Sequence, residues 1–434
     1  MKQQSTKRLY LVLGVAVYLL FLILYLNRSY PMVGHDYLYF LSNMLDSYIH
    51  YLENGLAVHW FTPSFGGGLP AFPNPQNIQF SLNQLLVFLV NPWCANLVSI
   101  SIYTMFGYYA CYRLGRDILQ LGWMASSLGA LFFMTTGFYI QHNAVGHVGY
   151  QVFPLICTIS YLIFSPRWTS WRRGVFIGVL IAIFIYGAGF YMIVMLGLSL
   201  LLVIPLVYLL KSDWFDLKGV LVVSSLGGAT ALLLSIGKLY AILRFMLHFP
   251  RVISDHYYSN FLESLIAFIM QLIGVPLFTL PYRLLNDDPT AVVSMMKEMI
   301  AGGKYGIWEK DVSISPVLIF ILVFSLRKVP GLIREMVNGR TLKQKLTGDR
   351  IIAASALVLG VWFVFEFISV RGVFYDLIRG LPIISSLHVN IRFTAAFVLP
   401  LAMLGAHIFE QEISVMKPTK QLKIFTFSFP DLGD

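Results

Sequence analysis

Ten long apolar runs constrain this chain more than any other feature of its sequence. An α-helix needs about 20 apolar residues to cross the hydrocarbon core of a bilayer, where each backbone N–H and C=O must be bonded within the segment. Only 12% of the residues are charged, whereas a typical soluble domain has about 25%. We therefore predict an all-α fold, a polytopic helical membrane protein with about ten transmembrane helices. The predicted spans are Leu9–Leu26, Ala95–Tyr112, Leu121–Ile140, Val148–Phe164, Val175–Ala188, Phe190–Leu210, Val220–Ile242, Val312–Leu326, Ile351–Ser369 and Phe393–Phe409.

The basic residues indicate which connectors face the cytoplasm. Of the 31 Lys and Arg residues, 20 lie in the two termini and in four connectors, and Arg327–Arg350 alone holds seven. Loops rich in Lys and Arg stay on the cytoplasmic side. The first run follows Lys7-Arg8 and lacks a cleavage signal, so we expect a retained helix with its N-terminus in the cytoplasm. The net charge of +10 therefore reflects topology in the cell membrane rather than a nucleic-acid partner.

The same alternation predicts one membrane domain, residues 1–410, followed by a cytoplasmic tail, 411–434. Its outer loops are expected at 28–94, 141–147, 243–311 and 370–392, and the long first loop should carry short helices. A very tight turn at Gly187-Ala188-Gly189 must separate two spans. Leu262–Leu280, interrupted by Gly274 and Pro276, is predicted to be an interfacial or re-entrant helix, with a spanning helix as the alternative.

The first outer loop holds the strongest candidate for catalysis. Asp36 follows the first helix by about ten residues and could act as a general base toward a hydroxyl acceptor. The alternative is a cap on a helix over Tyr37–Glu53. Further along, Trp60 stands in a stretch rich in Gly, Pro and aromatic residues. It could stack on a sugar ring or rest in the headgroup region.

Eight of the nine histidines fall in or beside the outer loops. His142 and His147 flank the short second loop. With His35 and Asp36 they could bind a divalent ion, since imidazole and carboxylate suit several metals. Polar contact with a phosphate or a sugar is the favoured interpretation.

Two charged residues lie at the outer mouths of spans. Glu309 precedes the eighth span, and Arg392 begins the tenth. An Arg at that depth is costly unless it is paired, and its planar fork matches a phosphate. The alternative is snorkelling to lipid headgroups. Lys238, Arg244 and Arg251 are further candidate phosphate contacts at an outer helix end.

This chain contains no sequence motif for nucleotide binding or hydrolysis. It contains no GxxxxGK[ST], no GxGxxG after a strand, no HExxH and no CxxC. We expect no ATP hydrolysis. An enzyme working at the outer face would also need a lipid-carried donor, because nucleotide-sugars are cytoplasmic.

Several of these segments together resemble the YfhO-like bacterial membrane proteins, which belong to the GT-C type of glycosyltransferases. The resemblance covers residues 1–410. The segments that carry it are Gly34-His35-Asp36-Tyr37, Asn54-Gly55-Leu56 with Trp60, Phe65-Gly66-Gly67-Gly68-Leu69-Pro70, Gly146-His147 before Pro154-Leu155, Tyr305-Gly306 with Glu309, and Ser386-Leu387-His388 before Arg392-Phe393. Family members are usually longer, so we expect either a fragment or a reduced member.

The resemblance implies an inverting transfer of a sugar at the outer face. The donor would be a polyprenyl-phosphate sugar and the acceptor a cell-envelope polymer, such as a teichoic acid, or a lipid. Asp36 takes the place of the catalytic acid. We assign no metal ligands, and a divalent ion, Mg²⁺ or Mn²⁺, is left open because His35 stands where many GT-C enzymes have a second acid. The predicted substrate-binding residues are His35, Trp60, His147, Glu309, His388 and Arg392.

Two other classes of function are carried alongside the transferase. One is a transporter or flippase for a lipid-linked or polymeric glycan, which would place charged groups near the middle of the membrane. The other is a non-catalytic assembly partner. Either would interact with membrane lipids, and neither requires nucleic acid.

Overall fold

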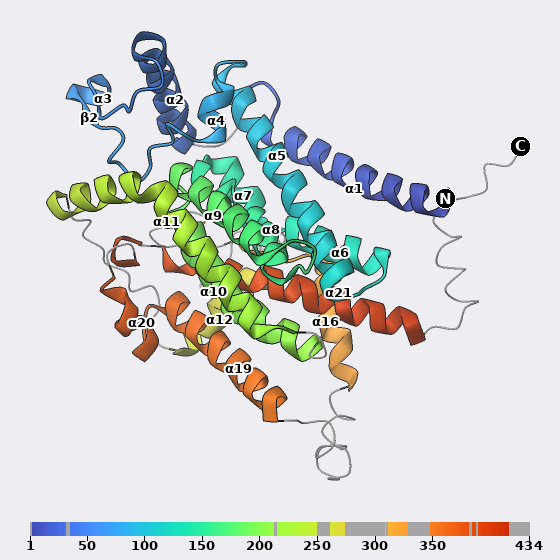
Figure 1. Ribbon diagram of the computed structural model, residues 1–434. Helices are drawn as coiled ribbons and strands as arrows, with labels where there is room; N and C mark the ends of the chain where they lie inside the picture. Colours follow the sequence, from blue (N-terminus) through green and yellow to red (C-terminus); the bar gives the residue numbers. More distant parts are fainter. Residues whose placement is uncertain are drawn as a thin grey trace, which may run out of the picture.

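The computed structural model describes residues 2–31, 35–211, 215–249, 261–273, 309, 311–328, 348–381, 384–387 and 389–415. Within these residues the chain is helical apart from one two-stranded sheet (Figure 1). Five helical segments are long and apolar enough to cross a membrane. They are Trp123–Val145, Phe190–Leu210, Leu217–His248, Gly348–Ser369 and Asn390–Ser414. The protein is therefore a helical polytopic membrane protein, and its total of about ten spans stays a prediction.

Each of the ten predicted apolar runs falls largely on helix. The helices are α1 (Lys2–Leu26), α5 (Pro92–Arg113), α6 (Trp123–Met134) with α7 (Gly137–Val145), α8 (Leu155–Phe164), α9 (Ser170–Tyr186), α10 (Phe190–Leu210), α11 (Leu217–His248), α16 (Pro316–Ser325), α19 (Gly348–Ser369) and α21 (Val398–Val415). Three runs begin differently from the prediction. Val148–Phe164 opens with a 3-10 turn, η2 (Val148–Tyr150), and Val312–Leu326 becomes helical only at Pro316. The last run begins inside a 3-10 helix, η6 (Asn390–Phe397).

The tight turn between α9 and α10 has the form that the sequence predicted. α9 ends at Tyr186 and α10 begins at Phe190, so only three residues connect them. Ala188 takes a left-handed conformation with φ 60°, which a residue with a Cβ adopts at some cost. The turn packs closely against η2. A Cβ added to Gly149 would lie 2.3 Å from the Ala188 carbonyl oxygen, so a larger residue has no room there.

Small residues allow α9 and α11 to lie side by side (Figure 1). A Cβ added to Gly174 would lie 2.5 Å from Leu226 Cβ, and one added to Gly178 would lie 2.4 Å from Thr230 Cβ. Helices in a bilayer associate largely through such close packing, since lipid tails are as apolar as the side chains they contact. Gly174 and Gly178, four residues apart on α9, thus form the surface that contacts α11.

The first loop, predicted from the sequence to lie on the outer side, forms a small subdomain at one end of the helix bundle (blue, top of Figure 1). It consists of α2 (His35–Asn54), β1 (Phe61–Thr62), α3 (Ser64–Gly67), β2 (Leu69–Pro70) and α4 (Leu82–Leu86). The strands pair antiparallel, with Phe61 opposite Pro70 and Thr62 opposite Leu69. The expected short helices are therefore present.

A lysine of α11 links this subdomain to the helix bundle by hydrogen bonds. Lys238 of α11 is buried, and its ammonium donates to the carbonyl oxygens of Phe72 and Asn74, the latter at 3.0 Å. It also lies 4.7 Å from the centre of the Phe72 ring. Lys238 was expected to contact phosphate, and the structure instead gives it backbone partners in the first loop.

Two further segments of the described chain follow α11 and α19. α12 (Phe261–Ile273) packs on α19 and η6; the rest of the predicted Leu262–Leu280 helix lies outside the described residues. After α19 come α20 (Val373–Arg379) and η5 (Ile384–Ser386). Glu366 anchors α20, because its carboxylate accepts from the Phe374 and Tyr375 amides and from Trp362 Nε1.

Candidate active site

The start of α2 fixes the position of Asp36. The next residue, Tyr37, is only 1% exposed. Its hydroxyl donates to the Asn143 carbonyl oxygen at 2.6 Å and accepts from Asn96 Nδ2 at 3.0 Å, while its ring lies edge-on to Trp93. Asp36 lies in the first helical turn, where the helix dipole favours a carboxylate. Its side chain remains 35% exposed.

The α7 helix continues further than the sequence suggested. Residues 141–145, expected in an outer loop, are helical, and His142 is completely buried. Polar residues indicated a loop, but the His142 ring packs on aromatic rings, with centroids 4.4 Å from Phe138 and 4.3 Å from Tyr150. Aromatic packing thus offsets the cost of placing a polar helix turn inside the protein.

A glycine turn then brings His147 to Asp36. Gly146 ends α7 in a left-handed conformation with φ 96°, and the His147 amide donates back to the His142 carbonyl oxygen at 3.0 Å. A Cβ on Gly146 would lie 2.6 Å from the Tyr37 nitrogen. This close approach places His147 Nε2 3.1 Å from Asp36 Oδ2.

Glu309 and Arg392 form a buried ion pair, although they are 83 residues apart. Arg392 donates from Nε and Nη2 to the two carboxylate oxygens of Glu309, and from Nη1 to the Tyr150 hydroxyl at 2.6 Å. Its guanidinium also lies over the rings of Tyr150 and Tyr191, at 5.1 and 4.9 Å from their centres. Such a fork-to-fork pair fixes the carboxylate in position and orientation.

The segment after Glu309 is held against the start of α7. The Gly137 amide donates to the Ser313 carbonyl oxygen at 2.9 Å, and Asp311 accepts from the Ser313 amide at 2.9 Å. A Cβ on Gly137 would lie 2.2 Å from Asp311 Oδ1. Burial raises the pKa of Asp311, and hydrogen bonds from Ser313 counter that rise. The approach at Gly137 explains how a distant segment brings Glu309 to the histidines.

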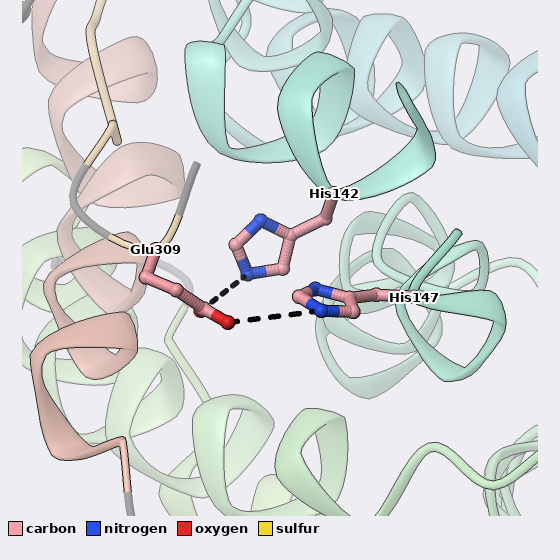
Figure 2. A group of neighbouring side chains, drawn as sticks. All are labelled: His142, His147 and Glu309. Atoms are coloured by element: carbon pink, nitrogen blue, oxygen red, sulfur yellow. Dashed lines mark ion pairs between the residues drawn. The ribbon is translucent and has the colours of Figure 1, made fainter. Parts of the chain in front are cut away.

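Glu309 joins these parts into one group of side chains, which we call the Glu309 cluster: Asp36, His142, His147, Glu309 and Arg392. Both imidazoles face the Glu309 carboxylate (Figure 2), with His147 Nε2 3.7 Å from Oε1 and His142 Nε2 3.8 Å from Oε2. The cluster runs from the half-exposed Asp36 inward through His147 and Glu309 to the buried Arg392. It combines a carboxylate able to accept a proton with a buried, charge-balanced ion pair whose guanidinium donates hydrogen bonds.

Four of the seven residues predicted for the site thus lie together: Asp36, His147, Glu309 and Arg392. Trp60 lies elsewhere, 59% exposed in the first loop, with its ring edge-on to Phe72. His35 begins α2, but its side chain lies outside the described part, as does His388. The roles assigned to all seven residues stay predictions.

Sequence reasoning gave no place to Tyr150, and it placed His142 in a loop as a candidate contact for a divalent ion, a phosphate or a sugar. A usable signal was present for Tyr150, since it follows His147 by three residues, one turn of the 3-10 helix η2. Nothing in the sequence indicated that Arg392 would pair with Glu309 through a contact between remote segments.

Comparisons with known proteins complete the description. No protein-family model and no curated protein matches the chain. Among solved structures it is similar to ArnT from Cupriavidus metallidurans in the apo state, with TM-score 0.43 and 15% identity over 93% of this chain and 78% of that one. It is also similar to ArnT from the same organism bound to undecaprenyl phosphate, with TM-score 0.41 and 15% identity over 94% and 81% of the two chains.

Proposed function

We propose that this protein transfers a sugar from a polyprenyl-phosphate donor to a hydroxyl of a cell-envelope polymer, such as a teichoic acid, or of a lipid, at the outer face of the cell membrane. The observation that carries the proposal is the Asp36–His147 contact of 3.1 Å at the edge of the Glu309 cluster. A half-exposed carboxylate held in one position by an imidazole is suited to accept a proton from a bound hydroxyl.

In the proposed reaction the acceptor oxygen attacks the anomeric carbon of the donor from the side opposite the phosphate. The acceptor O–H proton passes to Asp36 Oδ, the new C–O bond forms, and the bond from the anomeric carbon to the phosphate oxygen breaks. Configuration at the anomeric carbon is thereby inverted. The polyprenyl phosphate leaves as an anion, so the site must also stabilise negative charge.

Arg392 is the proposed cation for that leaving phosphate. Glu309 and Tyr150 engage three of its N–H groups, and a guanidinium has five. Because Glu309 balances its charge, Arg392 acts through directed hydrogen bonds more than through net charge. Placement at the start of the last membrane segment suits a donor whose lipid tail stays in the bilayer.

The buried charges in the described spans support a transporter less well than they support a transferase. Such a protein usually keeps charged groups near the midplane to mark a substrate path. Lys238 is engaged by backbone carbonyls of the first loop, and Glu366 anchors α20. Both charges thus have structural partners within the described part of the chain.

The test is transfer by purified protein in liposomes supplied with a labelled polyprenyl-phosphate sugar and an envelope polymer. Asp36→Asn keeps the size of the side chain but removes the base, and should lower the rate by about 10²–10⁴-fold. Glu53→Gln, an exposed acid on the same helix, is the matched control and should transfer normally.

Two results would overturn the proposal. One is unchanged transfer by a correctly inserted Asp36→Asn protein, which removes Asp36 from the chemistry. The other is movement of the labelled lipid across vesicles that contain no acceptor, which would indicate a transporter.

A further inference from the structure

Three metal-ligating groups surround one point between α7 and Glu309. Each of His142, His147 and Glu309 offers one ligand atom, and these atoms all lie within 4.8 Å of one another. Figure 2 shows both imidazoles and the carboxylate directed toward the same space. The residues come from a helix, the turn after it and a segment more than 160 residues away, so their convergence is a product of the fold.

Three of the four histidine ring nitrogens in this group lack hydrogen bonds, and the fourth, His147 Nε2, lies 3.1 Å from Asp36 Oδ2. His142 is fully buried, and neither of its ring nitrogens has a hydrogen-bond partner; His147 Nδ1 also has none. Buried polar atoms are nearly always bonded to protein, water or an ion, and an exception calls for an explanation. A neutral imidazole that keeps a lone pair directed at a carboxylate is arranged to bind a cation.

The distances are close to those of a metal shell. Ligand atoms about 2.0–2.2 Å from a tetrahedral Zn²⁺ lie roughly 3.3–3.6 Å from one another. Glu309 Oε2 is 3.8 Å from His142 Nε2, and Glu309 Oε1 is 3.7 Å from His147 Nε2. One ligand atom from each residue lies within 4.8 Å of the others, so the three groups must draw together to enclose an ion.

Arg392 and Tyr150 supply the support that a metal-binding carboxylate needs. The two hydrogen bonds from Arg392 reach both oxygens of Glu309, and a carboxylate oxygen can accept more than one bond. Metal-binding carboxylates are commonly held by such outer hydrogen bonds. The ion pair thus fixes the orientation of Glu309 toward the two histidines.

We propose that His142, His147 and Glu309 bind one divalent transition-metal ion of the zinc type. Two imidazoles and one carboxylate favour Zn²⁺ and its first-row neighbours over Mg²⁺, which prefers an all-oxygen octahedron. Three protein ligands leave room for a water molecule or a substrate oxygen in the shell. In the metal-bound form His147 Nε2 gives its lone pair to the ion and no longer donates to Asp36 Oδ2, which lies 3.1 Å away beside that position.

The metal proposal does not rest on sugar transfer, because it is tested by binding alone. Full-length protein in detergent micelles is stripped with a chelator and titrated with ZnCl₂ by calorimetry. We expect one Zn²⁺ per chain, retained in a large excess of Mg²⁺. His142→Gln and His147→Gln should each weaken Zn²⁺ binding at least about 100-fold, since loss of even a supporting group costs 10–100-fold.

His50→Gln is the matched control, since His50 lies on α2 and stacks on His59 away from the cluster; its Zn²⁺ affinity should equal that of the wild type. Co²⁺ substitution of the wild-type protein gives a readout independent of any variant, because a four-coordinate N/O site produces intense visible absorption.

The proposal is overturned if Zn²⁺ binds with the same affinity to His142→Gln and wild type, or if Co²⁺ gives only the weak spectrum of the aqueous ion. Metal binding without transfer would leave this inference standing while refuting the enzymatic one.

Discussion

The Glu309 cluster has a counterpart elsewhere in the bundle, and the two differ in how their charges are satisfied. Asp117 lies in the π-helical turn η1 (Leu114–Ile118) that follows α5. Its carboxylate accepts from Arg113 Nε at 2.8 Å, the Tyr161 hydroxyl at 2.9 Å and Arg167 Nη2 at 3.1 Å. The Arg167 side chain is 55% exposed. At Glu309, in contrast, the groups are buried and two histidines keep nitrogens without hydrogen bonds.

This difference fits a structural role for the Asp117 cluster and the ligand-binding role that we propose for the Glu309 cluster. The Asp117 cluster places several donors on one carboxylate near water, which ties the turn after α5 to α8 and to the connector that follows α8. The Glu309 cluster combines two donors from Arg392 with histidine nitrogens that have no hydrogen bond. Unsatisfied buried polar groups are costly, and they persist most readily where binding or catalysis requires them.

The sharpest test of the comparison is to remove the cation from the buried pair. Arg392→Met should destabilise the protein by about 3–5 kcal/mol, because it leaves the Glu309 carboxylate buried without its partner. Reversible unfolding in mixed micelles measures this difference. A loss below 1 kcal/mol would mean that water reaches Glu309 and that the cluster is less buried than described.

The next largest effect is expected at the turn that joins Asp36 to His147. Gly146→Ala should cost roughly 1–3 kcal/mol, since an L-residue is strained at φ 96° and its Cβ would meet the Tyr37 nitrogen at 2.6 Å. Transfer activity should fall with it, because the Asp36–His147 contact depends on this approach. Gly228→Ala on α11 is the control: its Cβ meets nothing within 4 Å, and it should be neutral. Equal effects of the two variants would contradict the assigned role of the turn.

A smaller effect is expected when the hydroxyl behind Asp36 is removed. Tyr37→Phe leaves the Asn143 carbonyl and the Asn96 amide without that partner and should cost about 1–3 kcal/mol. Thermal unfolding and transfer rate should both decline, whereas Tyr240→Phe, on an exposed ring of α11, should change neither. An unaltered transfer rate in Tyr37→Phe would show that the helix start is positioned by packing alone.

The smallest effect belongs to the Asp117 cluster. Arg167→Gln removes one exposed donor among several and should cost at most about 1 kcal/mol, a difference that shrinks further at high salt. Unfolding at low and high ionic strength measures it. A cost as large as that of Arg392→Met would erase the distinction between the two clusters.

Local pattern was sufficient to predict most of the fold. Hydropathy located all ten apolar runs, and glycines marked the turn between α9 and α10, because both signals depend only on neighbouring residues. The beginning of α2 near Asp36 could also be read from its sequence. The 3-10 start of the Val148–Phe164 run could not be read from its sequence, since Gly149 there packs against Ala188 in the turn between α9 and α10.

The site was predictable in its residue types but not in its pairing. Outer-loop histidines and acids named Asp36, His147 and Glu309 as candidates, whereas the partner of Arg392 is chosen by packing between segments far apart in the sequence. His142 was assigned to a loop because its polarity outweighed its aromatic surroundings, which only the fold reveals. Lys238 was misassigned for a similar reason, as a buried lysine can meet backbone carbonyls as readily as a phosphate.

The Lys238 anchor has a mechanical consequence. Its hydrogen bonds to the carbonyls of Phe72 and Asn74 couple the first loop to α11, and α11 is in turn interlocked with α9 through glycine contacts. The loop therefore cannot swing as an independent flap without breaking charge-assisted bonds in a buried setting. Any displacement of the loop that keeps these bonds must carry Lys238 and α11 with it.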